Sequence, residues 1–344
     1  QAKFFNVKNI VLTDYNSFLI ASKLLKNTKI KVFKNFDSLN EIFDKNKKID
    51  YSMCAISGFQ GLKPTLDIIK FTKTIAIANK ESIICGWNLI KKDLKKYKTY
   101  FIPVDSEHFS IWSLLDNNDK NNFEKIYLTA SGGPFRKLAL KKFKNISIKD
   151  ALKHPNWSMG KKISIDSATM MNKVFEIIEA KKIFNLSYDQ LDILIHPTSY
   201  LHAIVKFNNG LSKLLVHDTN MIIPIFNSIY FNTDKKLKSK NIDLKILNNL
   251  NLKKVDKIKF PVIKILKNMS KEDTLFETVI ISANDKLVKL FLNNKIKFTD
   301  ISNILLKICS ITEFNKFKSK TPKNIDEINN LANYVSLKID AMSV

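Results

Sequence analysis

Residues 154–180, HPNWSMGKKISIDSATMMNKVFEIIEA, form the stretch around which the rest of the chain is organised. It opens with a polar and aromatic loop at residues 154–160, and the alternation at residues 163–165 predicts a short strand. Asp166 and Ser167 are residue types whose side chains accept hydrogen bonds from the free N–H groups at a helix start. We therefore expect a loop, a strand and a helix within this one segment.

The expected helix carries chemistry on two consecutive turns. The hydroxyls of Ser167 and Thr169 lie in its first turn, where the positive end of the helix dipole suits an anion such as phosphate. Asn172 and Glu176 are four residues apart and share a face, and Lys173 precedes Glu176 by three residues. A plain amphipathic helix with a capping serine and a surface Glu–Lys pair explains the same residues equally well.

The composition is that of a globular protein. The chain has 344 residues, of which 45% are apolar and 26% are charged, and this length accommodates two or three domains. No apolar run approaches the length of a membrane span, so no membrane partner is expected. Cys54, Cys85 and Cys309 lack metal-ligand spacing and are too few for a disulfide scaffold. These cysteines favour a reducing, cytoplasmic setting.

The formal net charge of +25 raises the question of nucleic-acid binding. Two features argue against it. Arg136 is the only arginine, whereas base recognition in nucleic acids relies on bidentate arginine. The lysines are spread along the chain among asparagine and isoleucine rather than gathered in blocks. We therefore expect no nucleic-acid partner and interpret the lysine surplus as compositional drift.

Residues 1–103 alternate between short apolar runs and amphipathic segments. This rhythm predicts a parallel sheet with helices on both faces and ligands at the carboxyl ends of the strands. Strands are expected at residues 10–12, 30–33, 51–56, 74–78 and 99–104. Helices are expected between them at residues 17–25, 39–43, 62–71 and 81–94.

Asp105 and Glu107 follow the last of these strands, where a helix begins. At such a junction both carboxylates can turn toward one point, and the repulsion between them is relieved by a cation or a proton. Oxygen ligands of this kind suit Mg²⁺ or Mn²⁺, and Glu176 could supply a third. A helix cap with a solvated acid pair is the simpler explanation of an isolated Asp-x-Glu.

The rest of the chain predicts a second sheet and a helical end. The Gly132-Gly133 pair within residues 131–136 allows a loop that exposes N–H groups to an anion, or an ordinary tight turn. Strands expected at 191–197 and 203–207 look paired, and the second continues through Asn208-Asn209-Gly210 to a strand at 214–216. Helical apolar spacing predicts a small bundle from residues 260–266, 274–292, 301–308 and 325–338.

Several of these segments together resemble the 1-deoxy-D-xylulose 5-phosphate reductoisomerase family, enzymes that depend on NADPH and a divalent metal. The resemblance lies in AISGFQGL (55–62), ANKES (78–82), PVDSEHF (103–109), SGGPFR (131–136) and the 154–180 stretch. It implies an α/β fold with a Rossmann-like parallel-sheet domain, a central α+β catalytic domain and a C-terminal helical bundle. The implied boundaries are 1–103 for the NADPH-binding domain, 104–234 for the catalytic, metal-binding and dimerisation domain, 235–257 for a linker and 258–344 for the helical domain.

The resemblance also implies roles for individual residues. The metal ligands would be Asp105, Glu107 and Glu176, which with Lys173 form the catalytic set. Substrate would be bound by Ser106, Ser131, His154, Trp157, Ser167, Asn172 and Lys173, with residues 157–159 in a flap that closes over it. Cofactor contacts would come from Asn79, Lys80, Glu81, Met159 and Gly160. The implied partners are a phosphorylated deoxy-ketose substrate, which is rearranged and reduced to 2-C-methyl-D-erythritol 4-phosphate, and a second copy of the chain in a homodimer.

Some features depart from the family pattern. No glycine precedes Gly58, so we expect the glycine-rich start of the NADPH-binding domain to be missing from this chain and NADPH turnover by it to be poor. Val174-Phe175 replaces a common Gly-Leu, and Asn284-Asp285 replaces Asn-Glu. A catalytically impaired, non-redox or purely structural relative of the family therefore stays open as an alternative.

Overall fold

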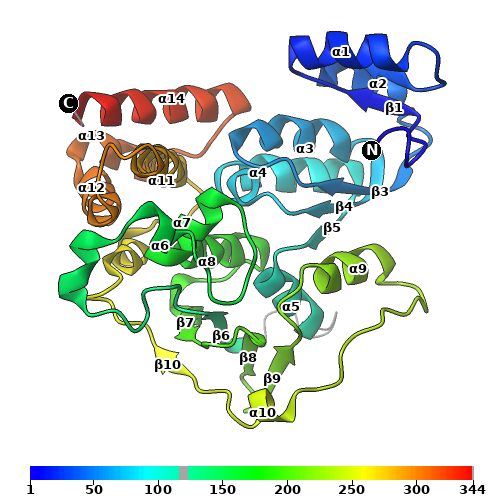
Figure 1. Cartoon of the computed structure of the whole chain (residues 1–344). Helices are drawn as coiled ribbons and strands as arrows, with labels where there is room; N and C mark the ends of the chain where they lie inside the picture. The colour runs from blue at the N-terminus through cyan, green and yellow to red at the C-terminus, as the bar shows by residue number, and fades with distance from the viewer. Residues whose placement is uncertain (116–122, 343–344) are drawn as a thin grey trace.

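The chain begins with a small parallel unit followed by a larger one. A computed structural model describes residues 1–115 and 123–342 (Figure 1). The first two strands pair in parallel around one helix, and a short helix follows: β1 (Asn9–Val11), α1 (Tyr15–Leu25), β2 (Lys31–Phe33) and α2 (Leu39–Ile42). Helix α1 begins where the Asp14 side chain accepts a hydrogen bond from the Ser17 N–H at 2.7 Å.

Three further parallel strands continue the β/α alternation. Their order in the sheet is the order in the chain, with the elements β3 (Ile49–Cys54), α3 (Leu62–Ile69), β4 (Thr72–Ile77), α4 (Lys80–Tyr97) and β5 (Tyr100–Pro103). The register aligns Cys54, Ile77 and Pro103, so the carboxyl ends of the three strands lie at one edge. The parallel Rossmann-like architecture expected from the sequence is confirmed, although β1–β2 and β3–β5 form separate hydrogen-bonded sheets in the described chain.

A five-stranded mixed sheet occupies the middle of the chain. Its order is β10-β7-β6-β8-β9, with β6 (Phe123–Ala130), β7 (Leu191–Ile195), β8 (Leu201–Phe207), β9 (Ser212–Val216) and β10 (Lys253–Lys254). The hairpin expected at Gly210, whose φ is +86°, is confirmed between β8 and β9. The expected pairing of residues 191–197 with 203–207 is wrong, because β6 lies between β7 and β8.

The middle region has six α-helices in the described chain, and the sequence predicted only two of them, one beginning near Asp105 and one near Asp166. They are α5 (Ser106–Leu114), α6 (Ile148–Ala151), α7 (Lys161–Thr169), α8 (Met171–Ile183), α9 (Ile222–Tyr230) and α10 (Leu244–Leu247). The strand expected at residues 163–165 is wrong, since these residues lie inside α7. Helical bonds over four residues hold them there: the Lys162–Asp166 ion pair at 3.3 Å and the Thr169 hydroxyl donating to the Ile165 carbonyl at 3.1 Å.

The chain ends in the expected helical bundle. It contains α11 (Phe276–Leu292), α12 (Phe298–Ser310), α13 (Thr312–Asn315) and α14 (Ile325–Met342). Short 3-10 helices connect elements throughout the chain: η1 (Phe36–Ser38), η2 (Phe59–Gly61), η3 (Leu140–Asn145), η4 (Tyr188–Gln190), η5 (Pro261–Asn268) and η6 (Lys316–Ser319). Figure 1 shows α7 and α8 between this bundle and the five-stranded sheet, and one apolar core runs through all three.

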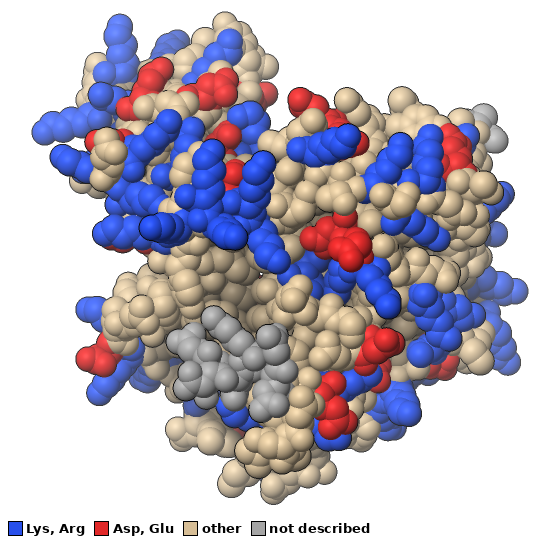
Figure 2. Space-filling view, turned by 180° about the vertical axis from the view of Figure 1, so that it is seen from behind, with Lys and Arg blue, Asp and Glu red and all other residues tan. Residues whose placement is uncertain are grey.

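The helices and the surface charge bear on the expectations for membrane and nucleic-acid partners. Within the described ranges, no helix is both long and apolar enough to span a membrane. Figure 2 shows lysine side chains over several parts of the viewed face, with groups of acidic side chains among them. The positive charge on this face is therefore distributed in more than one region.

Candidate active site

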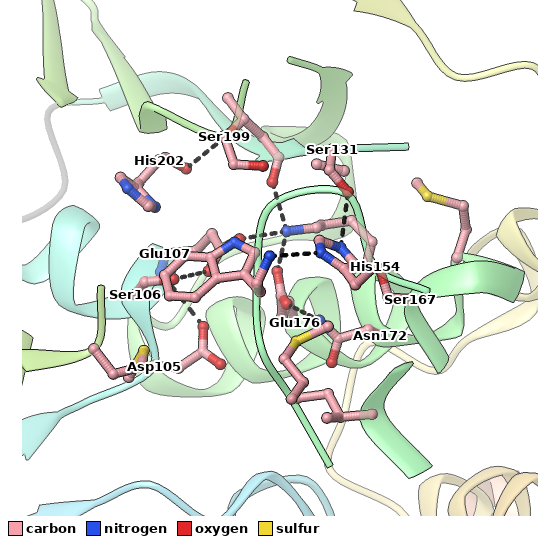
Figure 3. Close-up of a pocket in the computed structure, with 18 of the residues that line it drawn as sticks. Asp105, Ser106, Glu107, Ser131, His154, Ser167, Asn172, Glu176, Ser199 and His202 are labelled. Atoms are coloured by element: carbon pink, nitrogen blue, oxygen red, sulfur yellow. Dashed lines mark hydrogen bonds and ion pairs between the residues drawn. The ribbon is translucent and has the colours of Figure 1, made fainter. Parts of the chain in front are cut away.

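A cavity of about 260 Å³ lies where the carboxyl ends of β4, β5 and β6 meet helix α8 and the loop at residues 154–160 (Figure 3). The parallel strands β4 and β5 end at one edge of their sheet, and β6 of the five-stranded sheet ends at the same cavity, so segments far apart in sequence converge here. Twelve of the expected site residues line this cavity: Lys80, Asp105, Ser106, Glu107, Ser131, His154, Trp157, Met159, Ser167, Asn172, Lys173 and Glu176. Asn79, Glu81 and Gly160 do not line it.

Three carboxylates form the acidic end of the cavity. Asp105 is the N-cap of α5, Glu107 lies in its first turn, and Glu176 projects from α8. One oxygen of each lies within 4.8 Å of the others, a spacing that can hold a metal ion. The set offers oxygen ligands only, which fits Mg²⁺ or Mn²⁺ better than zinc.

Two lysines lie among these carboxylates. Lys173 Nζ lies 2.6 Å from Glu107 Oε1, forms an ion pair with Glu176, and donates to the Thr129 carbonyl at 2.5 Å. Lys80 Nζ forms an ion pair with Asp105 and lies 3.7 Å from Glu176 Oε1. Each lysine therefore contacts more than one acidic side chain.

Burial and neighbouring charges set the protonation of this end. Burial, together with the repulsion from Glu107, raises the pKa of Glu176 to about 8. Burial opposes the charge on Lys173, but Glu107 and Glu176 outweigh it and raise the lysine pKa. For Asp105, burial is likewise outweighed, and Lys80 with His108 holds the pKa well below its usual range. A divalent cation would relieve the repulsion that keeps Glu176 protonated.

The opposite end of the cavity is built from uncharged donors. Ser131 Oγ lies 3.1 Å from His154 Nε2, and Ser167 lines the same cavity. Asn172 also lines the cavity, but its side-chain amide donates to Glu176 Oε1. Burial, aided by the charge of Lys173, lowers the pKa of His154 to about 4, so this ring is neutral at pH 7. Its Nδ1 accepts hydrogen bonds from the N–H groups of residues 156 and 157, so Nε2 carries the ring proton and faces Ser131.

Ser167 reaches this end differently from the sequence expectation. It lies in the last turn of α7 rather than at a helix start, so the expected helix start at Asp166 is wrong. The helix is interrupted at Met170, a buried residue with a left-handed φ of 67°, and α8 starts at Met171. The helix N-terminus near the cavity is therefore that of α8, with Asn172 in its first turn.

The sequence and the fold have relatives among known proteins. Family models described as 1-deoxy-D-xylulose 5-phosphate reductoisomerase match residues 1–86, and models of its C-terminal domains match residues 101–184 and 217–335. A relative of that name from Pelagibacter ubique (strain HTCC1062) is 85% identical over 344 residues, which cover 100% of this chain and 89% of the relative. This chain belongs to the 1-deoxy-D-xylulose 5-phosphate reductoisomerase family.

More distant relatives agree. A 1-deoxy-D-xylulose 5-phosphate reductoisomerase from Sulfurihydrogenibium sp. (strain YO3AOP1) is 39% identical, over 90% of this chain and 81% of its own length. The solved reductoisomerase from Zymomonas mobilis in complex with NADPH has a TM-score of 0.86 at 29% identity, covering 99% of this chain and 87% of that one. A DOX-P reductoisomerase in complex with NADPH, fosmidomycin and magnesium has a TM-score of 0.88 at 30% identity, with the same coverage.

The segments of this reductoisomerase-family chain that were expected to touch a cofactor are engaged in protein contacts. Asn79 caps α4, accepting from the Ser82 N–H at 2.5 Å and donating to the Gly58 carbonyl at 3.0 Å. Glu81 lies 2.9 Å from Lys162. These contacts fix the turn at the end of β3 and the start of α4.

A second acidic group was missed in the sequence. Asp105, which the first group also contains, brings a ligand atom within 4.8 Å of those of His108 and Glu179. Burial opposes the charge on His108, but Glu179 and Asp105 raise its pKa to about 9. Helical spacing could have revealed this group, because Glu179 follows Glu176 by three residues and His108 follows Asp105 by three.

Proposed function

We propose that this chain converts 1-deoxy-D-xylulose 5-phosphate into 2-C-methyl-D-erythritol 4-phosphate, with NADPH as the reductant. One observation carries the proposal: a single cavity has three convergent carboxylates with Lys173 and Lys80 among them at one end and neutral hydrogen-bond donors at the other. The proposed substrate would present neighbouring carbonyl and hydroxyl oxygens to the metal-binding end and its phosphate to the other. Solved relatives with NADPH, with fosmidomycin and with magnesium support this interpretation.

Asp105, Glu107 and Glu176 would hold the divalent ion, and the all-oxygen set favours Mg²⁺ or Mn²⁺. When bound, such an ion polarises neighbouring substrate oxygens and stabilises the negative charge that develops on them. Lys173 keeps its proton, since the surrounding carboxylates raise its pKa. It therefore acts as a donor to a substrate oxygen rather than as a general base.

The phosphate would be bound by Ser131, Ser167 and Asn172, with the Nε2 proton of His154 as a further donor. A neutral imidazole can donate to a phosphate while Nδ1 stays bonded to the loop backbone. Trp157 would cover the bound substrate, because its ring packs edge-on against His202 at 6.3 Å on the cavity wall. Closing the cavity in this way excludes water from the reacting carbons.

The wider assignments are proposals of the same kind. The nicotinamide cofactor would be bordered by Met159 and Gly160 and by the start of α4 at Asn79, Lys80 and Glu81. The domain boundaries at residues 103/104, 234/235 and 257/258 would separate cofactor, catalytic, linking and helical parts. A homodimer would form through the apolar face of α9, and the three unpaired cysteines support a reducing cytoplasm.

The proposal is tested by mixing the chain with the substrate, Mg²⁺ and NADPH and following NADPH absorbance and the product by mass spectrometry. We expect NADPH consumption that is slow, as anticipated from the sequence, that matches formation of the reduced product, that stops with EDTA and that fosmidomycin inhibits. The Lys173→Met variant is the matched control and should be inactive. Rearranged product without NADPH consumption would instead identify a non-redox isomerase.

A further inference from the structure

One partly exposed lysine outside the cavity joins three parts of the molecule. Lys162 is the second residue of α7, two residues after the loop at residues 154–160. Its Nζ lies 2.9 Å from Glu81 Oε1, 3.0 Å from Asp285 Oδ1 and 3.3 Å from Asp166 Oδ2. These carboxylates belong to α4, α11 and α7, so one ammonium connects three helices.

This cluster has more negative than positive charge at its centre. Burial raises the pKa of Asp285 to about 7, and burial of Lys162 is outweighed by its three carboxylates, which raise the lysine pKa. Asn284 donates to Asp166 Oδ1 at 2.7 Å. Lys161 and Lys289 line the cavity of about 410 Å³ that opens beside Lys162 and Asp285. Removing the ammonium would leave three facing carboxylates without their shared partner.

The cluster lies at one end of the loop that covers the active-site cavity. At the other end, the Asn156 side chain donates to the Pro197 carbonyl and to Ser199, both at 2.8 Å. Between the two ends, Ser158 and Met159 line the cavity and make no hydrogen bond or ion pair with the described chain. The position of this middle part therefore depends on how its ends are held.

The same cluster connects the loop to the acidic end of the cavity. Glu81 directly follows Lys80, whose ammonium contacts Asp105. Helix α7, which carries Lys162, also carries Ser167 at its far end. A shift of α7 relative to α4 would thus move the loop and Ser167 away from Lys80 and the carboxylates together.

We infer that Lys162 is a positioning residue for the proposed reaction: through Glu81, Asp166 and Asp285 it holds the loop at residues 154–160 over the substrate. This inference rests on the proposed function, because it assumes that the substrate occupies the cavity under this loop. Lys162 itself does not line that cavity. Its loss should weaken substrate binding more than it slows the chemical step.

The variant Lys162→Met keeps the length of the side chain and removes the charge, and Lys161→Met is the matched control on the exposed neighbouring position. At about pH 8, where Asp285 is ionised in the wild type, we expect Lys162→Met to raise the substrate KM by about tenfold or more with a smaller change in kcat. Lys161→Met should leave both unchanged, and Lys162→Arg should restore most of the lost affinity. Circular dichroism checks that each variant is folded.

A second measurement separates this inference from the proposed function. Tryptophan fluorescence, titrated with 1-deoxy-D-xylulose 5-phosphate and Mg²⁺ in the absence of NADPH, reports binding without turnover. Binding by the wild type without NADPH-dependent turnover would overturn the proposed function and leave the positioning role testable by Kd. An unchanged Kd and KM in folded Lys162→Met would overturn the inference. If Lys162→Met does not fold, Asp285→Asn removes one carboxylate, and its KM must rise for the inference to stand.

Discussion

Glu176 is the carboxylate on which the proposed metal site most depends, because it is 1% exposed and lies beside both Asp105 and Glu107. The variant Glu176→Gln keeps the shape of the side chain and removes one charge from the ion's surroundings. We expect the Mg²⁺ or Mn²⁺ affinity to fall by roughly one to two orders of magnitude, measured by titration calorimetry. Glu124→Gln, at an exposed ion pair with Lys206, should leave the metal affinity unchanged. Equal affinities for the two variants would exclude Glu176 as a ligand.

The sequence predicted the proposed metal site from the kind and placement of its acidic residues. Asp105 and Glu107 next to a strand end, and Glu176 on a helix with Asn172, pointed to one oxygen-ligand site, and the structure brings the three together. Contacts between distant residues could not be predicted in the same way. The contact of Glu81 with Lys162 spans 81 positions and depends on how α4 packs near α7, which no local pattern encodes.

At the level of elements, the glycine loop after β6 determines how closely that strand approaches α7. Gly133 has a φ of +65°, and a Cβ there would lie 2.8 Å from the Ser167 carbonyl oxygen. Gly210 has a φ of +86° and open space around it, so a substitution there tests the cost of the left-handed backbone conformation without a steric clash. Gly210→Ala should lower the free energy of unfolding by about 1 kcal/mol without changing KM.

Gly133→Ala should be more destabilising than Gly210→Ala and should also raise the substrate KM, because the clash moves Ser167 within the proposed phosphate site. Denaturant unfolding and steady-state kinetics measure the two effects. An unchanged KM in a folded Gly133→Ala variant would show that this approach does not shape the site.

The contact between α7 and α11 should respond to pH through Asp285. Its pKa of about 7 in the folded chain exceeds the ordinary value of 3.8, so the folded state binds the extra proton between these values. The stability gained from this proton is present at low pH and lost as pH rises through 7. Relative to the wild type, Asp285→Asn should therefore gain roughly 1 kcal/mol in the free energy of unfolding between about pH 6 and pH 8. A difference that does not vary with pH would show that Asp285 titrates normally.

The helix break at Met170 explains why the central stretch was read incorrectly. Breaks are predicted from glycine or proline, and neither occurs between Lys161 and Ile183. The alternation of apolar and polar residues at 163–165 therefore predicted a strand, although these residues belong to the helix that starts at Lys161. The left-handed Met170 is fixed by packing in the core, where it is 2% exposed, and such a constraint is not visible in a local pattern.

For the molecule as a whole, the alternation of strands and helices was enough to predict the parallel architecture and the helical end. Strand order in the five-stranded sheet was not predictable from neighbours in sequence. The connection at residues 196–200 looked like a link between adjacent strands, yet its chain crosses the end of β6, with the His196 N–H bonded to the Ala130 carbonyl at 2.7 Å. Sequence proximity favours β7–β8 pairing, whereas β6 lies between these two strands and pairs with both.

Helix α9 presents an apolar stripe that the described chain leaves uncovered. Ile222, Ile225 and Ile229 are 56%, 36% and 41% exposed, and their spacing of three and four residues places them on one face. Burying such side chains is worth about 1.5–3 kcal/mol each, so an uncovered stripe favours association with a second copy. We expect the wild type to have the mass of a dimer in light scattering at micromolar concentration.

The double variant Ile225→Asp/Ile229→Asp should shift the mass to that of the monomer, because it would place four carboxylates opposite one another across a two-fold interface. Leu337→Asp, on the exposed face of α14, is the control and should leave the mass unchanged. Metal affinity should persist in the monomeric variant, since Asp105, Glu107 and Glu176 all belong to one chain. A monomeric wild type would contradict the dimer. A double variant that stays dimeric would show that the dimer forms through a surface other than α9.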